Sequence, residues 1–518
     1  MTAEWVVRKV DEARLTRIAE LAALKVRAGD LITLNGDLGA GKTTFARSFI
    51  RALLDDLDAE VPSPTFTLVQ SYPTPRIEVA HFDLYRLNSP DELDEIGFDE
   101  AVTGGVALVE WPERAEDRLH GNTLEVSLAS GDTADTRTVT LTADTGWSAR
   151  LERLREIEGF LDVIPDPKVT LRYMQGDAST RAYARLTDAQ RSQILMDSPR
   201  MPDGPPIRDG LPYSRIAHLA EDVTAFHAVR EALAACGLNV PRIVKHDHAR
   251  GFLLTEDFGD TTFGRALAEG VSQRTLWAAA LDVLAALRAH APAERLPVPG
   301  GGEHILHRFD RAALLIEVEL LTDWYWPAVK GKPIPAQAKA DFLRIWNAQI
   351  DWLETLPLGW VLRDYHSPNL MWPGDGRVGV LDFQDSMRGP WAYDVVSLLQ
   401  DARLDVPENL ERALLAGYRA KVSAREPDFD AAVFDNAYAI LGAQRNTKLL
   451  GIFRRLSHRD GKHAYLAHIP RIWRYMERNL RHPALAELRG WLDTHFPPAG
   501  REKDFPLSPL SSMGRGSG

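Results

Sequence analysis

Two phosphate-handling signatures of different design lie far apart in this chain of 518 residues. The first, residues 36–43, has the sequence GDLGAGKT, a glycine-rich turn that ends in Lys-Thr and matches the P-loop pattern. The second, residues 363–369, has the sequence RDYHSPN, in which an aspartate and an asparagine are separated by four residues. Both patterns are typical of phosphoryl transfer, but they position phosphate and metal differently. We therefore expect two domains, each with its own ATP site.

Composition places the chain among ordinary globular proteins, with 45% hydrophobic and 26% charged residues. The net charge of −12 argues against a global electrostatic grip on nucleic acid, so any involvement of tRNA is expected to be indirect or through a local patch. Cys236 is the only cysteine, which excludes an internal disulfide. The start of the chain does not resemble a signal peptide, and the apolar run 277–291 contains Asp282 and Arg288, so we expect no membrane segment and a cytoplasmic enzyme.

Periodicity predicts two kinds of domain. Apolar runs at 31–34, 79–82 and 106–109 predict buried strands, and helical stripes flank the first of them, which is the setting of an α/β P-loop NTPase domain over residues 1–146. Short strands at 169–173, 182–186 and 193–196, followed by mostly helical periodicity, predict an α+β, two-lobed, protein-kinase-like domain over residues 148–498. The Pro-, Ser- and Gly-rich residues 499–518 predict a disordered tail.

The P-loop residues can be given roles from the chemistry of phosphate binding. A glycine-rich turn exposes backbone N–H groups to phosphate oxygens, and the start of the following helix adds partial positive charge. Lys42 is expected to reach the β- and γ-phosphates, and the Thr43 hydroxyl to ligate Mg²⁺. The expected nucleotide-binding residues are Gly36, Gly39, Ala40, Gly41, Lys42, Thr43 and Thr44.

A P-loop needs further groups to bind metal and to orient water. Asp83 ends the apolar run 79–82, where a Walker-B carboxylate belongs, with a solvated loop aspartate as the alternative. Glu110 ends the run 106–109 and is expected to hold Mg²⁺ or to position water. Thr65 lies between Pro64 and Phe66 in a stiff, hydroxyl-rich segment, which predicts either a switch-like loop near the γ-phosphate or a plain surface turn.

These motifs together resemble the TsaE family of small ATPases. The resemblance rests on residues 36–43, 63–66, 81–87 and 109–114 in this order, and it covers residues 1–145. It implies Mg-ATP hydrolysis in support of TsaB- and TsaD-like partners, which modify adenosine 37 of tRNA with a threonylcarbamoyl group. It further implies that Lys42 binds phosphate, that Thr43 and Glu110 hold Mg²⁺, that Asp83 supports the nucleotide site, and that Trp111 lies beside it.

The second signature predicts a kinase-type catalytic loop. In that design the aspartate, here Asp364, accepts the proton of the acceptor hydroxyl, and the asparagine, here Asn369, holds Mg²⁺. Asp382 follows an apolar strand predicted at 378–381 and stands where kinases have Asp-Phe-Gly, so it is expected to be the second Mg²⁺ ligand. The alternative is that these residues are unrelated polar groups of loops.

Other residues near this loop have more than one interpretation. His366 either contacts the acceptor or braces the loop, and Asp394 is expected to cap and brace rather than to catalyse. Glu256 follows the strand predicted at 252–254, as expected of a hinge near the adenine, although an edge strand gives the same pattern. The lysine that kinases carry on the third small-lobe strand is missing, because no lysine occurs between Lys168 and Lys245, and Arg181 or Arg185 is the candidate substitute.

The C-terminal motifs resemble the aminoglycoside phosphotransferase superfamily and, within it, the AmgK-like amino-sugar kinases. The resemblance rests on residues 176–181, 195–199, 363–370 and 381–385 and spans about residues 150–495. It implies an ATP-dependent anomeric kinase of N-acetylmuramate and N-acetylglucosamine in peptidoglycan recycling. AmgK-like sequences share the missing lysine.

A basic cluster follows the kinase motifs, formed by Arg445, Lys448, Arg454 and Arg455. It is interpreted either as a solvated helix face or as the site of an anionic acceptor group.

The leading hypothesis is a bifunctional fusion of an ATPase and an amino-sugar kinase. In one alternative the C-terminal half phosphorylates aminoglycosides, which are cationic and would require an acidic pocket. In another it is a catalytically silent regulatory or scaffold module, for which the missing lysine is the best support.

Overall fold

The protein is described here from a computed structural model. The structure describes residues 3–87, 89–133, 135–163, 166, 169–174 and 181–501, without the side chains of residues 116 and 117. The expected glycine loop at 176–180 and residues 502–518 of the expected tail lie outside the described residues. No helix among the described residues combines the length and the apolar character needed to cross a membrane.

The chain folds into two compact units. Unit 1 holds residues 1–199 and 243–257, and unit 2 holds residues 200–242 and 258–518. Unit 1 therefore contains the P-loop region together with the first strands of the kinase-like region. The motif-based boundary at residues 146–148 concerns the two functions and stays a prediction.

Within the described residues of unit 1, seven strands form a mixed sheet in the order β1-β7-β6-β2-β5-β4-β3. The central strands β6, β2, β5 and β4 are parallel, and antiparallel pairs close both edges. Because neighbouring parallel strands run in the same direction, the carboxyl ends of β2, β5 and β4 lie at the same edge of the sheet, and Asp83 is in register with Glu110. The strands are Ala3–Val10, Asp30–Asn35, Val69–Pro73, Glu78–Asp83, Val106–Glu110, Asn122–Ser130 and Arg137–Ala143, numbered β1 to β7.

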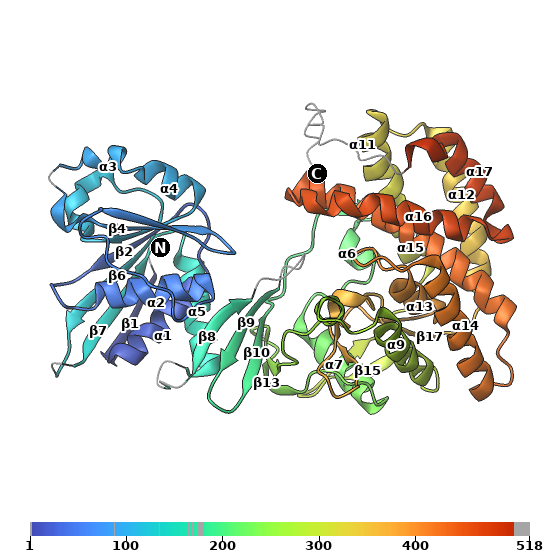
Figure 1. Cartoon of the computed structure of the whole chain (residues 1–518), viewed down its shortest axis with the longest axis horizontal. Helices are drawn as coiled ribbons and strands as arrows, with labels where there is room; N and C mark the ends of the chain where they lie inside the picture. Colours follow the sequence, from blue (N-terminus) through green and yellow to red (C-terminus); the bar gives the residue numbers. More distant parts are fainter. Residues whose placement is uncertain are drawn as a thin grey trace. The chain divides into compact units, whose positions relative to one another are not determined.

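Helices cover both faces of this sheet, as expected of an α/β fold (Figure 1). One face packs against α1 (Glu12–Ala23), α2 (Lys42–Leu54) and α5 (Ser148–Leu161). The other face packs against α3 (Glu92–Glu95) and α4 (Phe98–Gly104). The 3₁₀ segments Leu84–Arg86 and Pro112–Arg118 follow β4 and β5 directly.

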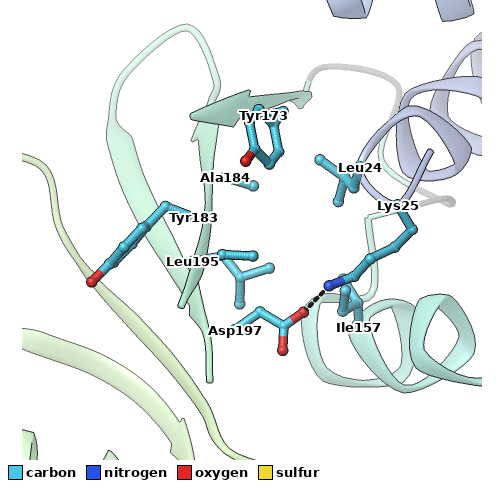
Figure 2. A pocket seen from close by; sticks show the side chains of 9 residues that line it. Leu24, Lys25, Ile157, Tyr173, Tyr183, Ala184, Leu195 and Asp197 are labelled. Carbon is cyan, nitrogen blue, oxygen red and sulfur yellow. Dashed lines mark hydrogen bonds and ion pairs between the residues drawn. The ribbon is translucent and has the colours of Figure 1, made fainter. Parts of the chain in front are cut away.

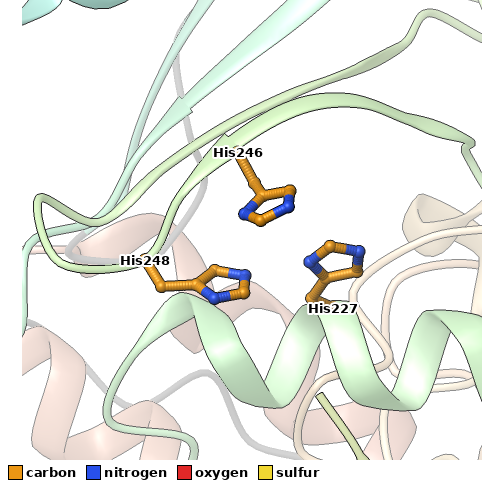
Figure 3. A group of neighbouring side chains, drawn as sticks. All are labelled: His227, His246 and His248. Atoms are coloured by element: carbon orange, nitrogen blue, oxygen red, sulfur yellow. The ribbon is translucent and has the colours of Figure 1, made fainter. Parts of the chain in front are cut away.

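A second, antiparallel sheet in unit 1 comprises, in the described part of the chain, five strands in the order β13-β14-β10-β9-β8. The hairpin β13–β14 turns at Gly251, where an added Cβ would lie 2.3 Å from the carbonyl oxygen of Ser198. The rings of His246 and His248 beside this turn stack 4.4 Å apart (Figure 3). The strands are β8 Thr170–Met174, β9 Ala182–Thr187, β10 Ser192–Asp197, β13 Ile243–Asp247 and β14 Phe252–Glu256.

The two sheets of unit 1 share one hydrophobic core. Buried residues of α1, α2 and α5 continue without a break into the buried residues Leu171, Ala184, Leu195 and Phe252 of the antiparallel sheet. Helix α5 contributes to this connection, since its apolar side chains Leu154, Ile157 and Phe160 belong to the same core. Burial of each such side chain contributes about 1.5–3 kcal/mol, so the P-loop region and this sheet stabilise one another.

Polar contacts line the same junction. The backbone N–H of Leu171 donates to the buried carboxylate of Glu20, 3.0 Å away. Asp197 forms ion pairs with Lys25 and with Arg153, whose Nη2 lies 2.6 Å away. Figure 2 shows Lys25 and Asp197 facing one another in a small pocket between α1, α5 and the sheet, which Tyr173 and Ile157 also line.

Unit 2 is mostly helical, with short hairpins that hold the second signature. Its helices are α6 Tyr213–Ile216, α7 Val223–Ala235, α8 Phe263–Ala268, α9 Gln273–Leu287, α10 Arg311–Leu320, α11 Trp326–Lys330, α12 Ala336–Leu353, α13 Ala392–Leu399, α14 Glu408–Arg425, α15 Ala431–Asp460, α16 Ile469–Leu480 and α17 Ala486–His495. A π-helical turn, Leu321–Tyr325, joins α10 to α11, and 3₁₀ turns occur at Ser367–Asn369, His463–His468, Pro483–Leu485 and Pro498–Gly500. Its strands are β11 Pro206–Arg208, β12 Leu211–Pro212, β15 Arg295–Pro297, β16 Glu303–Ile305, β17 Gly359–Val361, β18 Leu370–Met371, β19 Gly379–Val380 and β20 Met387–Gly389.

The strand predicted at 378–381 is shorter than expected. Only Gly379 and Val380 pair with β18. Asp382 has a positive φ of 56°, which turns the chain out of the extended conformation. The aspartate expected to bind metal therefore follows the strand in a turn.

At the C-terminal end of the described residues the chain is packed rather than loose. Pro498–Gly500 form a 3₁₀ turn, and Arg501 is buried with ion pairs to Glu477 and Asp493.

Candidate functional site

The P-loop lies between β2 and α2, the setting that the pattern requires. Gly36, Gly39 and Gly41 all have positive φ, and a Cβ at Gly36 would lie 2.6 Å from the carbonyl oxygen of Leu128. Ala40 lies in the turn and donates its N–H to the carbonyl of Asp37, 3.1 Å away. The glycines thus allow a tight turn of backbone at the N-terminus of α2, which suits an anion.

Lys42 is the buried cation of this loop. Its Nζ donates to the carbonyl oxygens of Gly36 (2.5 Å) and Asp37 (3.0 Å) and lies 3.5 Å from the centre of the Trp111 ring. Burial lowers the pKa of Lys42 from its ordinary value, although the negative charge of Glu110 opposes the shift. Trp111, predicted beside the site, therefore covers the lysine from one side.

Glu110 connects the P-loop to the neighbouring strands. One carboxylate oxygen accepts a hydrogen bond from the Thr43 hydroxyl at 3.1 Å, and the other lies 3.0 Å from Nε2 of the fully buried His81. Thr43 and Glu110 are hard oxygen donors next to a phosphate-binding turn, so this pair fits the ligand preference of Mg²⁺. Thr44, the next residue of α2, is half-buried.

Asp83 and Thr65, both expected at the nucleotide site, are brought into contact. Its Oδ2 accepts hydrogen bonds from the hydroxyls of Ser63 and Thr65, both at 2.7 Å, and its Oδ1 accepts one from the N–H of Tyr85. Asp83 is buried, so it is not a solvated loop aspartate. Asp83 thus holds the loop that contains Thr65 against the end of β4, and Asp83 itself is in register with Glu110 on β5.

The second signature is assembled within unit 2. The side-chain amide of Asn369 donates to the backbone carbonyl of Asp364 at 2.9 Å and to Oδ2 of Asp382 at 3.4 Å. Oδ1 of Asp382 accepts a hydrogen bond from Gln384 at 2.8 Å. Asn369 and Asp382, the expected metal ligands, thus lie side by side next to the expected base, and their oxygen atoms fit Mg²⁺.

Asp394 braces the backbone just before Asp364 in the loop of the second signature. Its buried carboxylate accepts hydrogen bonds from the N–H groups of Leu362 (2.6 Å) and Arg363 (3.0 Å). Arg363 has a positive φ of 71°, an unusual conformation for a non-glycine residue that such contacts can hold in place. Burial raises the pKa of Asp394 to about 7.

Asp364 is surrounded by charge. Burial acts to raise its pKa, but the positive charges around it, that of Lys448 most of all, more than offset this, so the pKa lies below its ordinary value. Asp364 is therefore ionised at neutral pH, as a proton acceptor must be. Burial lowers the pKa of the adjacent His366 to about 4, so that ring is neutral at pH 7 and cannot act as an acid there.

A buried glutamate organises the cations near Asp364. Glu317 on α10 accepts hydrogen bonds from Arg363 and Lys448, each at 2.6 Å, and from Gln444 at 2.9 Å. The sequence analysis missed this residue, and its only signal is a charged side chain inside the apolar run 314–318. His81 was also missed, although its spacing of two residues from Asp83 on one strand places both on the same face.

The basic cluster on α15 is not a solvated helix face, and that interpretation is wrong. Arg445, Lys448 and Arg454 are only 3%, 7% and 9% exposed. The middle of this helix is buried on all sides, because it packs against α10, α13 and α16. Arg455 is half-buried and lies over the ring of Tyr213.

The residues predicted on the antiparallel sheet belong to unit 1. Glu256 ends β14 and is exposed, and Arg181 directly precedes β9 and is half-buried. Arg185 on β9 forms an ion pair with Asp257 at 2.7 Å. Strand β10, where kinases carry their lysine, holds Ser192–Asp197 and has no lysine.

Comparison with known proteins gives matches in both halves. A family model described as the threonylcarbamoyl adenosine biosynthesis protein TsaE matches residues 10–139. A second, described as the phosphotransferase enzyme family, matches residues 170–432. These matches confirm the predicted fold classes and their order along the chain.

Curated relatives agree with the family models. The N-acetylmuramate/N-acetylglucosamine kinase of Caulobacter vibrioides is 37% identical over 335 residues, which cover 62% of this chain and 91% of that protein. The kinase of the same name from Pseudomonas aeruginosa is 35% identical over 343 residues, covering 65% of this chain and 91% of that protein. The tRNA threonylcarbamoyladenosine biosynthesis protein TsaE of Rickettsia felis is 42% identical over 118 residues, covering 23% of this chain and 68% of that protein. The chain therefore belongs to the TsaE family through its N-terminal part and to the phosphotransferase enzyme family through its C-terminal part, and it joins two ATP-using families in one polypeptide.

Proposed function

We propose that the protein is a bifunctional enzyme with two separate Mg-ATP sites. The N-terminal part is a Mg-dependent ATPase that serves tRNA threonylcarbamoyladenosine synthesis together with TsaB- and TsaD-like partners. The C-terminal part is an anomeric kinase that phosphorylates N-acetylmuramate and N-acetylglucosamine. The net charge of −12 supports indirect rather than direct contact of this chain with tRNA.

The contact of Thr43 with Glu110 carries the first half of the proposal. The Thr43 hydroxyl and the Glu110 carboxylate would hold Mg²⁺, while the turn at Gly36–Gly41 and Lys42 would hold the phosphates. Bound Mg²⁺ would neutralise charge that develops on the phosphates. His81 keeps the Glu110 carboxylate oriented, and Asp83 keeps Thr65 in place beside it.

The contact of Asn369 with Asp382 carries the second half. These residues would hold Mg²⁺, and the ionised Asp364 would accept the proton of the acceptor hydroxyl as that oxygen attacks phosphorus. Asp394 and Asn369 fix the backbone on both sides of Asp364. A silent scaffold would not need an ionised aspartate beside two metal-type ligands.

Two assays on the full chain test this proposal. In the first, threonylcarbamoylation of tRNA is reconstituted with TsaB- and TsaD-like subunits, and multiple turnover should require this chain. In the second, transfer of phosphate from ATP is measured with N-acetylmuramate, N-acetylglucosamine and kanamycin as acceptors. Phosphorylation of kanamycin alone would overturn the cell-wall role, and no transfer to any acceptor by a chain that binds ATP would overturn the kinase.

A further inference from the structure

Arg445 on α15 is a buried cation without a protein partner among the residues that the structure describes. Arg445 is only 3% exposed, and no described residue forms an ion pair or hydrogen bond with its side chain. Its Nε is a buried donor left unsatisfied. Lys448, one turn further along the helix, is equally buried but is paired with Glu317 at 2.6 Å.

The position of Arg445 is next to the catalytic loop. Residues three apart on a helix share one face, so Arg445 lies on the same face as Lys448. Lys448 reaches the loop through Glu317, whose same carboxylate oxygen also binds Arg363, the neighbour of Asp364. The charge of Arg445 also acts on Asp364, His366 and Asp394, which places it within electrostatic reach of all three.

An unpaired buried charge lowers the free energy of unfolding, so buried charges in proteins are usually paired or bind a ligand. The effective cost is several kcal/mol per ion unless a counter-charge and hydrogen bonds compensate it. Of the described carboxylates near Arg445, Glu317 is held by Arg363 and Lys448, and Asp394 is held by two backbone N–H groups. Asp364 is within electrostatic reach of Arg445 but forms no ion pair or hydrogen bond with it. A guanidinium is best matched by a carboxylate that it can bind with two parallel hydrogen bonds.

We propose that Arg445 binds the carboxylate of an acidic sugar acceptor and so selects N-acetylmuramate, which carries a lactyl carboxylate, from N-acetylglucosamine, which has none. The inference rests on the proposed kinase function and adds a specificity residue to it. When the acidic acceptor binds, its carboxylate provides the hydrogen-bonded counter-charge that no described residue gives Arg445. The neutral acceptor has no carboxylate for Arg445 to bind.

The test compares the two acceptors in one variant. Arg445→Met is made in the full chain on a Lys42→Ala background, so that ATP consumption reports the kinase alone. We expect kcat/KM for N-acetylmuramate to fall by about 100-fold, the usual loss when one partner of a buried charge pair is removed, mostly through KM. The value for N-acetylglucosamine should change by less than about threefold, and this activity also shows that the variant is folded.

Two further variants make the result specific. Arg445→Lys keeps the charge but loses the planar fork, so it should recover part of the activity toward N-acetylmuramate. Arg459→Gln, an exposed arginine near the end of the same helix, is the matched control and should leave both acceptors unaffected. An equal loss toward both acceptors, or an unchanged value for N-acetylmuramate, would overturn the inference while the kinase stands. A wild-type chain that phosphorylates neither sugar would instead overturn the proposed function, and the inference with it.

Discussion

Lys25, two residues beyond the end of α1 in the P-loop region, forms an ion pair with Asp197, the last residue of β10 in the antiparallel sheet (Figure 2). Arg153 on α5 binds the other oxygen of the same carboxylate. The pair lies at the edge of a continuous core, so the nucleotide-binding turn and the first kinase-like strands belong to one folded unit.

Asp197→Ala should therefore destabilise both activities together. Loss of the carboxylate leaves Lys25 without its ion-pair partner in a mostly buried place and leaves Arg153 with Glu156 alone as a carboxylate partner, which costs about 3 kcal/mol. Thermal inactivation of ATP hydrolysis and of sugar phosphorylation should shift to lower temperature in parallel. Glu152→Gln breaks an exposed pair with Arg155 on α5 and should change the free energy of unfolding by no more than about 0.5 kcal/mol, so neither activity should be inactivated at a clearly lower temperature. Inactivation of only one activity in Asp197→Ala would contradict a shared unit.

Lys42→Ala should abolish ATP hydrolysis by the P-loop and spare sugar phosphorylation. The loop loses the buried cation that its own carbonyls and Trp111 hold in place. Both activities are measured on the same full-length preparation, with Arg118→Ala as a control that removes an exposed positive charge. Hydrolysis at the wild-type rate in the absence of acceptor would rule out the assignment of this loop.

Asp364→Asn and Asp382→Asn should fail at different steps. On a Lys42→Ala background, Asp364→Asn should still bind nucleotide, while phosphoryl transfer falls by roughly 10²–10⁴-fold because the base is lost. Asp382→Asn should weaken Mg²⁺-dependent nucleotide binding as well as turnover, because it removes a charged ligand beside Asn369. Equilibrium binding with and without Mg²⁺ separates the two, and normal Mg²⁺-dependent binding by Asp382→Asn would disprove its role.

The strands that build the P-loop site were predictable because their residues are apolar on both faces. The runs 79–82 and 106–109 are apolar throughout, which predicts strands buried on both faces, and they form central parallel strands of the sheet. The polar residues that follow these runs, Asp83 and Glu110, therefore lie in register. The edge strands β1 and β3 were missed, since Ala3–Val10 and Val69–Pro73 mix charged or polar residues with apolar ones. Edge strands are half solvated and leave a weaker pattern.

The environment of the kinase loop could be predicted only in part. The spacing of Asp364, Asn369 and Asp382 is local and visible in the sequence. The partners Glu317 and Lys448 come from helices far along the chain, and their pairing depends on how α10 and α15 pack. The shared core of unit 1 was not predictable for the same reason. The sequence shows that Leu171 and Phe252 are apolar, but it does not show which helices they pack against.

Asp394 should make the stability of the protein depend on pH in a direction opposite to that of most carboxylates. Burial raises its pKa to about 7 in the folded chain, whereas an unfolded aspartate has a pKa near 3.9. Between these values the folded state binds more protons than the unfolded state, so this group's contribution to stability falls as the pH rises from about 4 to about 7. His366 acts in the opposite sense over about pH 4–6.5, because burial lowers its pKa to about 4.

A comparison of wild type with Asp394→Asn isolates the aspartate, since the contribution of His366 is common to both and cancels. The free energy of unfolding of wild type minus that of Asp394→Asn should become more negative between pH 4.5 and 7.5, by about 4 kcal/mol at most, at about 1.4 kcal/mol for each unit of pKa shift. Urea denaturation of the full chain at several pH values, followed by tryptophan fluorescence, measures this difference. Asp385→Asn, which removes a half-buried carboxylate that accepts a hydrogen bond from the N–H of Ala220, is the matched control and should not reproduce the slope. A difference that stays constant across this range would mean that the carboxylate of Asp394 is already ionised at pH 4.5, held so by the N–H groups of Leu362 and Arg363.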